Sequence, residues 1–75
     1  MYEKRYKKIG AKILYFRKIW GLTQEQLAEK VGITAKYLSR VETGSYPNSV
    51  SLSTLMIIAD KLNVHTSELL SDIEE

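Results

Sequence analysis

The helix predicted over residues 35–43 carries polar side chains three and four positions apart: Lys36, Ser39, Arg40 and Thr43. This spacing puts them on one face of the helix. Lys36 and Arg40 give that face two cations and no acid, while Leu38 and Val41 point the opposite way and are expected to be buried. Such a stripe can donate hydrogen bonds to a polyanion, or it can be an ordinary solvated face.

The segment before this helix favours recognition over plain solvation. A second short helix is predicted over residues 24–30, and only Gly32 and its neighbours separate the two. Two helices joined by three or four residues that include a glycine form a helix-turn-helix, which leaves one face of the second helix projecting. A helix presented in this way fits the major groove of DNA, which is about 12 Å wide.

Residues beside the stripe can add contacts to DNA. Ala35 is small enough to approach a thymine methyl group, and Tyr37 can meet a base edge or the sugar-phosphate backbone. Arg40 suits guanine better than Lys36, because only arginine presents a planar fork of donors. Gln24 adds its amide to the free N–H groups at a helix start, which attract phosphate. The loop over 44–50 offers further donors that either bind phosphates or only build the turn: Ser45, Tyr46, Asn48 and Ser49.

Helix starts repeat along the chain as an apolar residue, then Ser or Thr, then three residues, then Leu. The hydroxyl of such a residue caps the helix, and the apolar pair fixes the angle at which the chain enters it. The copies are Leu22-Thr23…Leu27, Ile33-Thr34…Leu38 and Val50-Ser51…Leu55, with a weaker one at Val64-His65…Leu69. With glycines as stops, they predict an all-α, compact five-helix bundle in a single domain, with helices at about 3–20, 24–30, 35–43, 52–63 and 67–73.

Composition limits the classes of function. The 75 residues contain no cysteine, so disulfides and thiolate metal sites are absent, and a lone histidine, His65, argues against a protein-only zinc site. The net charge is +2, with a basic start at residues 1–8 and an acidic end at residues 66–75. Charged residues interrupt every apolar stretch, so we expect a cytoplasmic protein without a membrane span. No catalytic grouping, cofactor site or small-molecule site is evident, and we expect no enzymatic activity.

One apolar surface is left over once the core is assigned. The predicted fourth helix has a core stripe without Met56 and Ile57, and the last helix adds more apolar area than a short terminal helix needs. A chain of this size gains stability by dimerising. The sequence therefore predicts a two-fold interface formed by Met56, Ile57, Leu69, Leu70 and Ile73.

The sequence resembles the Cro/phage-repressor (XRE-type) helix-turn-helix family. The residues that carry the resemblance are Gly21-Leu22-Thr23-Gln24-Glu25-Gln26-Leu27-Ala28, Val31-Gly32-Ile33-Thr34, Tyr37-Leu38-Ser39-Arg40-Val41-Glu42 and Gly44, and it extends over about residues 9–70. It implies a lambda-repressor-like domain, with its helix-turn-helix at about 23–43, that binds double-stranded DNA as a homodimer on a two-fold symmetric operator. By size, the chain is also similar to the controller proteins of restriction–modification systems.

The resemblance also implies roles for individual residues. Gln24 contacts phosphate or base, Thr34 and Tyr37 lie where such contacts occur, and four positions face base edges: Ala35, Lys36, Ser39 and Arg40. Arg17 and Glu42 are implied to pair beside the DNA face; otherwise they are two separately solvated side chains. The alternative function is a protein-interaction module, such as an antitoxin that covers a toxin.

Overall fold

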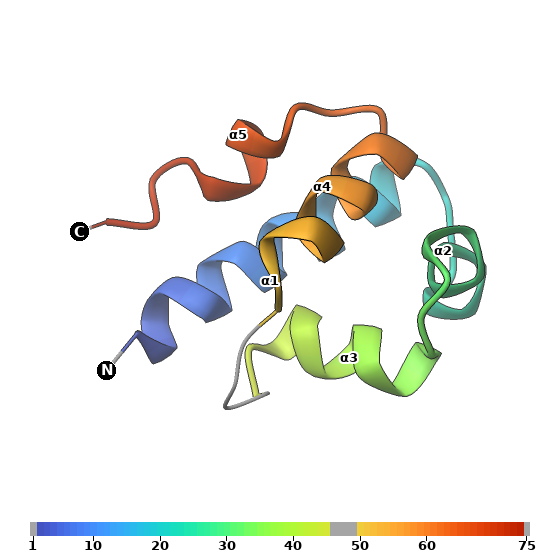
Figure 1. Cartoon of the computed structure of the whole chain (residues 1–75), viewed down its shortest axis with the longest axis horizontal. Helices are drawn as coiled ribbons and strands as arrows, with labels where there is room; N and C mark the ends of the chain where they lie inside the picture. The colour runs from blue at the N-terminus through green and yellow to red at the C-terminus, as the bar shows by residue number, and fades with distance from the viewer. Residues whose placement is uncertain (1, 46–49, 75) are drawn as a thin grey trace.

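The computed structural model describes residues 2–45 and 50–74 of the chain, and within these ranges the backbone forms five α-helices and no strand. In chain order they are α1 (Glu3–Ile19), α2 (Gln24–Val31), α3 (Ala35–Thr43), α4 (Leu52–Lys61) and α5 (Thr66–Leu70) (Figure 1). The all-helical prediction is confirmed. Across the described part of the chain, no helix combines the length and the apolar character needed to cross a bilayer.

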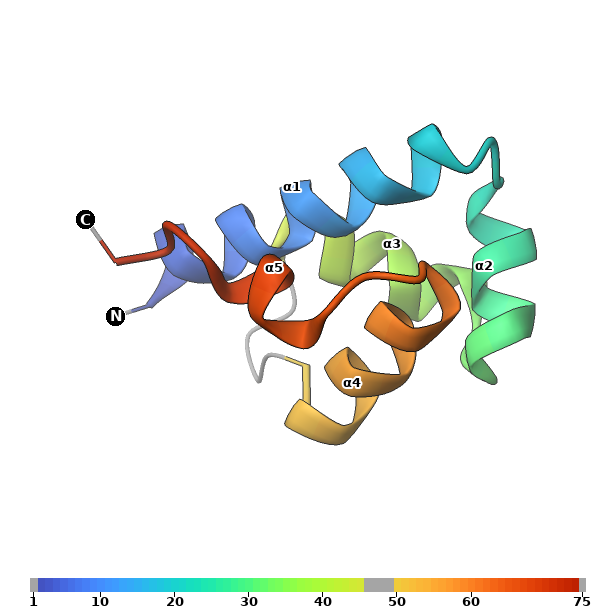
Figure 2. The same ribbon diagram turned by 90° about the horizontal axis from the view of Figure 1, so that it is seen from above.

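The helices enclose one apolar core. Helix α1 contacts both α3 and α5, and α5 also contacts α4 (Figure 2). All five helices or their caps contribute buried side chains, which are Ile9, Ile13, Leu27, Ala28, Leu38, Val41, Leu55, Ile58, Ala59, Leu62 and Leu69. Burial of a Leu or Ile side chain contributes about 1.5–3 kcal/mol, so this cluster supplies most of the stabilisation of so small a chain.

The three predicted hydroxyl caps are confirmed. Oγ1 of Thr23 accepts from the backbone N–H of Gln26, and Oγ1 of Thr34 accepts from that of Tyr37, both at 3.0 Å. The hydroxyl of Ser51 accepts from the backbone N–H of Thr54 at 3.2 Å, at the start of α4. Because each cap depends only on residues close in the chain, the local sequence is enough to fix where α2, α3 and α4 begin.

Helices α4 and α5 are shorter than the sequence predicted. Helix α4 stops at Lys61 rather than Asn63, because Asn63 adopts a left-handed conformation with φ of 58° and the next N–H turns back to the carbonyl of Ala59. Helix α5 begins at Thr66 and stops at Leu70 rather than Ile73, because the backbone becomes extended at Ser71. His65 occupies the position before α5, as expected of a helix-start residue.

Close backbone contact fixes α3 against α1. A Cβ built on Gly10 would stand 2.2 Å from the carbonyl oxygen of Val41 and 2.5 Å from that of Glu42, so only glycine allows the two helices to approach this closely. At the far end of α1, the indole N–H of Trp20 donates to the carbonyl of Leu62 at 2.6 Å, which ties α1 to the end of α4. Helix α1 therefore contacts α3 closely at Gly10 and is tied to α4 beyond its C-terminal end.

Candidate nucleic-acid interface

Helix α3 has one buried and one exposed face. Leu38, Val41 and Glu42 are buried, whereas Lys36 and Arg40 are exposed. Neither of these two cations makes a side-chain hydrogen bond or ion pair within residues 2–45 and 50–74. Both therefore remain available to an external partner that offers hydrogen-bond acceptors and negative charge.

The other polar and flanking side chains of α3 are either partly buried or already hydrogen-bonded within the chain. Ser39 is half-buried, and Ala35 and Tyr37 are half-buried against the core. The hydroxyl of Thr43 is exposed, but it already donates to its own helix, at 3.1 Å from the carbonyl of Ser39, and lies 2.8 Å from the hydroxyl of Ser45. Lys36 and Arg40 are thus the exposed side chains of α3 whose polar groups have no partner within the described residues.

A buried polar network holds α3 in register with α1 and α2. Arg17 on α1 donates to both carboxylate oxygens of Glu42, at 2.7 Å from Nε and 3.1 Å from the second terminal nitrogen. The side chains of Arg17 and Glu42 are only 9% and 2% exposed, so the structure places this ion pair in the interior of the domain. The remaining terminal nitrogen of Arg17 donates to the carbonyl of Leu22 at 2.8 Å.

Gln24 joins the same network, which the sequence did not predict. Its side-chain amide donates to Oε1 of Glu42 at 2.9 Å, and the side chain is half-buried. One amide hydrogen and the amide oxygen are left for a ligand at the start of α2. Spacing along the chain could not reveal this contact, because Gln24 and Glu42 are 18 positions apart and meet only through the packing of α2 on α3.

Of the hydrogen-bond donors predicted in the loop after α3, only Ser45 lies within the described residues. Ser45 is exposed directly after α3, whereas Tyr46, Asn48 and Ser49 lie outside the described residues. At the other end of α3, Thr34 is exposed but its hydroxyl oxygen accepts the capping hydrogen bond. Its hydroxyl hydrogen remains available for a phosphate oxygen, since an N-cap hydroxyl accepts through a lone pair.

The predicted dimer surface requires a correction. Met56 and Ile57 are 49% and 41% exposed, but Leu69 is fully buried in the core of its own chain and cannot contact a second copy. Leu70 and Ile73 are half-buried against the same core. Leu52, which was not among the predicted interface residues, is 61% exposed one turn before Met56 and extends the apolar surface of α4. Leu52 is the first residue of α4, where helical periodicity along the sequence gives little indication of which face a side chain occupies.

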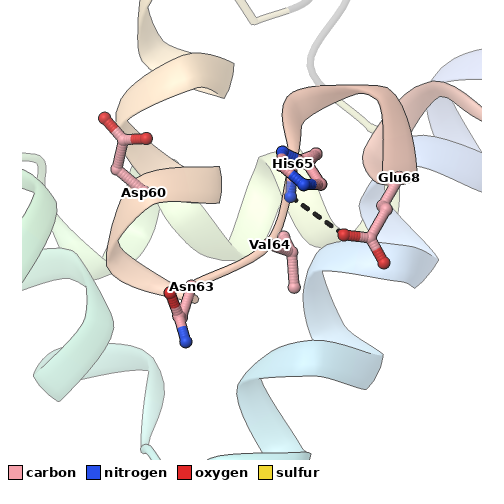
Figure 3. Close-up of a pocket in the computed structure, with 5 residues that line it drawn as sticks. All are labelled: Asp60, Asn63, Val64, His65 and Glu68. Carbon is pink, nitrogen blue, oxygen red and sulfur yellow. Dashed lines mark hydrogen bonds between the residues drawn. The ribbon is translucent and has the colours of Figure 1, made fainter.

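A hollow between the end of α4 and the start of α5 lies apart from α3. It is lined by Asp60, Asn63, Val64, His65 and Glu68, and the carboxylate of Glu68 accepts from the backbone N–H of His65 at 2.9 Å (Figure 3). Its two carboxylates would repel a polyanion. In the part of the chain that the structure describes, no three His, Asp or Glu side chains are grouped to hold a metal ion.

Two short helices joined through Gly32, with exposed cations on the second, define a helix-turn-helix protein. The sequence of residues 13–69 matches the HTH_3 helix-turn-helix family, and the chain belongs to that family. It is 38% identical over 64 residues to the immunity repressor protein of Bacillus phage phi105, covering 85% of this chain and 43% of the repressor.

Two further proteins extend the comparison. The chain is 43% identical over 56 residues to control protein C.SmaI of Serratia marcescens, covering 75% of this chain and 64% of that protein. The chain thus spans less than two thirds of either of these relatives. Its fold also matches that of the biofilm regulator SinR in complex with DNA, with a TM-score of 0.78 and 33% identity, over 84% of this chain and 98% of the SinR chain.

Proposed function

We propose that this chain is a sequence-specific double-stranded DNA-binding transcriptional regulator that acts in the cytoplasm by binding alone, without enzymatic activity. The observation that carries the proposal is the contrast within α3: Glu42 is locked in a buried network, while Lys36 and Arg40 are exposed and unpaired within the described residues. A helix held rigidly on one face with free cations on the other is suited to enter a major groove.

The proposed contacts follow from the chemistry of each side chain. Arg40 donates in a bidentate manner to O6 and N7 of guanine, and Lys36 contacts the same type of base edge as a single charge. Gln24, Thr34, Ser39, Thr43, Ser45 and Asn48 contact phosphates or bases at the margins, with Ala35 and Tyr37 close to the groove. A good bidentate base contact contributes about 1–3 kcal/mol of discrimination, so specificity depends mainly on Arg40.

The relatives support regulation as the outcome of binding. One is an immunity repressor of a phage and another is a control protein, and SinR has been observed with DNA. We infer that this chain acts in the same way, as a repressor or as the controller of a restriction–modification system. Nothing in its chemistry requires a cofactor or a small-molecule ligand.

We further propose that two copies bind together on a two-fold symmetric operator. Leu52, Met56 and Ile57 form an exposed apolar strip along α4, which a second copy would cover. A two-fold interface uses the same patch on both subunits, so a strip on a single helix is sufficient to build it. The two copies of α3 would then address half-sites about 10–10.5 bp apart, or a multiple of that spacing.

Selection of bound DNA from a random pool, followed by footprinting, tests the proposal. We expect enrichment of a palindromic sequence, protected at two half-sites with the spacing given above. Recovery of no enriched sequence would contradict sequence-specific binding. Recovery of a single unrepeated half-site would contradict the two-fold arrangement while leaving the DNA-binding proposal intact.

Salt dependence separates this function from the alternative of a protein-interaction module such as an antitoxin. Each neutralised phosphate contributes about −0.9 to the slope of log affinity against log salt, so several contacts give a steep decline. Binding to a protein through an apolar surface would change little over the same range of salt. A flat salt response, combined with capture of a protein partner, would favour the alternative.

A further inference from the structure

The basic segment at the start of α1 is divided between two faces of the helix. Arg5 forms an ion pair with Glu74 at 3.4 Å, and the Lys8 ammonium donates to the carbonyl of Asp72 at 3.5 Å. One turn further along, Lys12 donates to the carbonyl and the hydroxyl of Ser71. These three cations recur at helical spacing and hold the acidic C-terminal segment against α1.

Lys7 lies on a different side of α1. Adjacent residues of a helix are rotated by about 100°, so Lys7 turns away from the segment that Lys8 holds. It packs instead on Gly44, the C-cap of α3: a Cβ built on Gly44 would stand 2.6 Å from Cγ and 2.7 Å from Cα of Lys7. Its side chain is exposed, and within residues 2–45 and 50–74 its ammonium makes no hydrogen bond or close ion pair, although its charge helps to lower the pKa of the exposed Glu3 carboxyl one turn earlier.

This position matters because the C-terminal end of a helix repels anions. The carbonyl end of α3 carries a partial negative charge, equivalent to about half an electron, whereas the free N–H groups at its start attract phosphate. Helix α3 has nine residues, which corresponds to about 13.5 Å, and the major groove is about 12 Å wide. A group at the end of α3 is therefore close to the phosphates that form a wall of the groove.

We propose that Lys7 of α1 binds a DNA phosphate next to the C-terminal end of α3. The inference rests on the proposed function and extends it, because it adds a contact from a helix outside the helix-turn-helix. The stem of Lys7 is fixed by its contact with Gly44, and its ammonium supplies the positive charge that this end of α3 lacks. Lys8, one residue further on, instead donates to the carbonyl of Asp72 in the C-terminal segment.

Lys7→Gln and Lys8→Gln form a matched pair for testing this contact. Each removes one positive charge from an adjacent position of the same helix, so an effect of net charge alone would be equal in both. The probes are the duplex recovered by selection and a scrambled duplex of the same length. At about 0.9 in salt slope for each phosphate, loss of one contact weakens binding about fivefold near 0.15 M salt.

For each bound subunit, we expect Lys7→Gln to lose about fivefold in affinity on both duplexes and to reduce the salt slope by about 1, with Lys8→Gln close to wild type. A methylphosphonate scan should reveal one phosphate per half-site whose neutralisation weakens the wild-type protein but not Lys7→Gln, and Lys7→Arg should restore that sensitivity. Thermal melting checks that every variant is folded.

Two other results would overturn parts of the account separately. If the wild-type protein binds the selected duplex but Lys7→Gln and Lys8→Gln have equal slopes, the Lys7 contact is wrong and the proposed function stands. If the wild-type protein shows no preference for the selected duplex over the scrambled one, the proposed function itself fails, whatever Lys7 does.

Discussion

Helices α3 and α4 each turn one face to solvent, and the two faces differ in chemistry. The exposed face of α3 carries Lys36 and Arg40, whereas that of α4 carries Leu52, Met56 and Ile57. Both helices bury their opposite faces in the same core. The comparison shows how a small bundle can present two surfaces of different chemistry, a basic one suited to a polyanion and an apolar one that we propose is covered by a second copy of the chain.

The two helices also differ in how they are fixed. Helix α3 is attached through a buried charged network, Arg17–Glu42–Gln24, in addition to its apolar contacts. Helix α4 is attached mainly by Leu55, Ile58 and Ala59, with Trp20 bonded to the carbonyl of Leu62 at its end. Hydrogen bonds are directional, so the network sets the orientation of α3 more sharply than apolar packing sets that of α4.

The largest expected effect is on stability, from Glu42→Ala. The substitution leaves the buried Arg17 guanidinium without its carboxylate, and it removes the acceptor of the Gln24 amide. Breaking a buried pair in this way costs about 3–5 kcal/mol. Chemical denaturation measures the loss, with Glu29→Ala, an exposed carboxylate on α2, as the control. A Glu42→Ala protein as stable as the control would show that the network does not hold α3.

The next effect concerns the apolar face of α4. Ile57→Glu places a charge at the centre of the proposed two-fold interface, where it occurs twice, so we expect the dimer to weaken by about 3 kcal/mol, more than a hundredfold in dissociation constant. Sedimentation measures the change. Ile19→Glu introduces the same charge at a 60% exposed position of α1 and should leave the association unchanged. Equal behaviour of both variants would contradict the assignment of the interface to α4.

The smallest expected effect comes from removing the N-cap hydroxyls of α3 and α4, which should differ in their effect on DNA binding. Thr34→Ala and Ser51→Ala each remove an N-cap hydroxyl, at the starts of α3 and α4 respectively, and each should cost about 1 kcal/mol of stability. Only Thr34→Ala should also weaken DNA binding, because only α3 enters the groove in the proposed complex. Thermal melts and binding titrations of the two variants, side by side, measure both quantities. An equal loss of DNA affinity would remove Thr34 from the proposed interface.

Much of this architecture could be predicted from local sequence. The caps at Thr23, Thr34 and Ser51 and the stop at Gly44 depend on neighbouring residues only, and they fixed the beginnings of α2, α3 and α4 and the end of α3. The exposed cations of α3 also followed from its helical periodicity. Where the pattern was weaker, at Asn63 and beyond Leu70, the predicted helices ran too far.

The remaining features depend on contacts between distant parts of the chain. Leu69 was predicted to lie at a dimer surface, but α5 folds back onto α1 and α4, which buries this side chain. The bond from Gln24 to Glu42 and the packing of Lys7 on Gly44 likewise arise only when helices meet. Helical spacing identifies which side chains share a face, but it does not identify the element that lies opposite that face.

The central claim, that the exposed face of α3 reads DNA, is tested most directly by the double variant Lys36→Ala/Arg40→Ala. Its charge-matched control is Lys30→Ala/Lys61→Ala, which removes two exposed cations from α2 and α4. Loss of two base contacts at about 1–3 kcal/mol each predicts a loss of operator affinity between about thirtyfold and twenty-thousandfold per half-site, with thermal melting unchanged and the control close to wild type. Operator binding that survives the double substitution, or unfolding caused by it, would contradict the assignment of α3 as the reading helix.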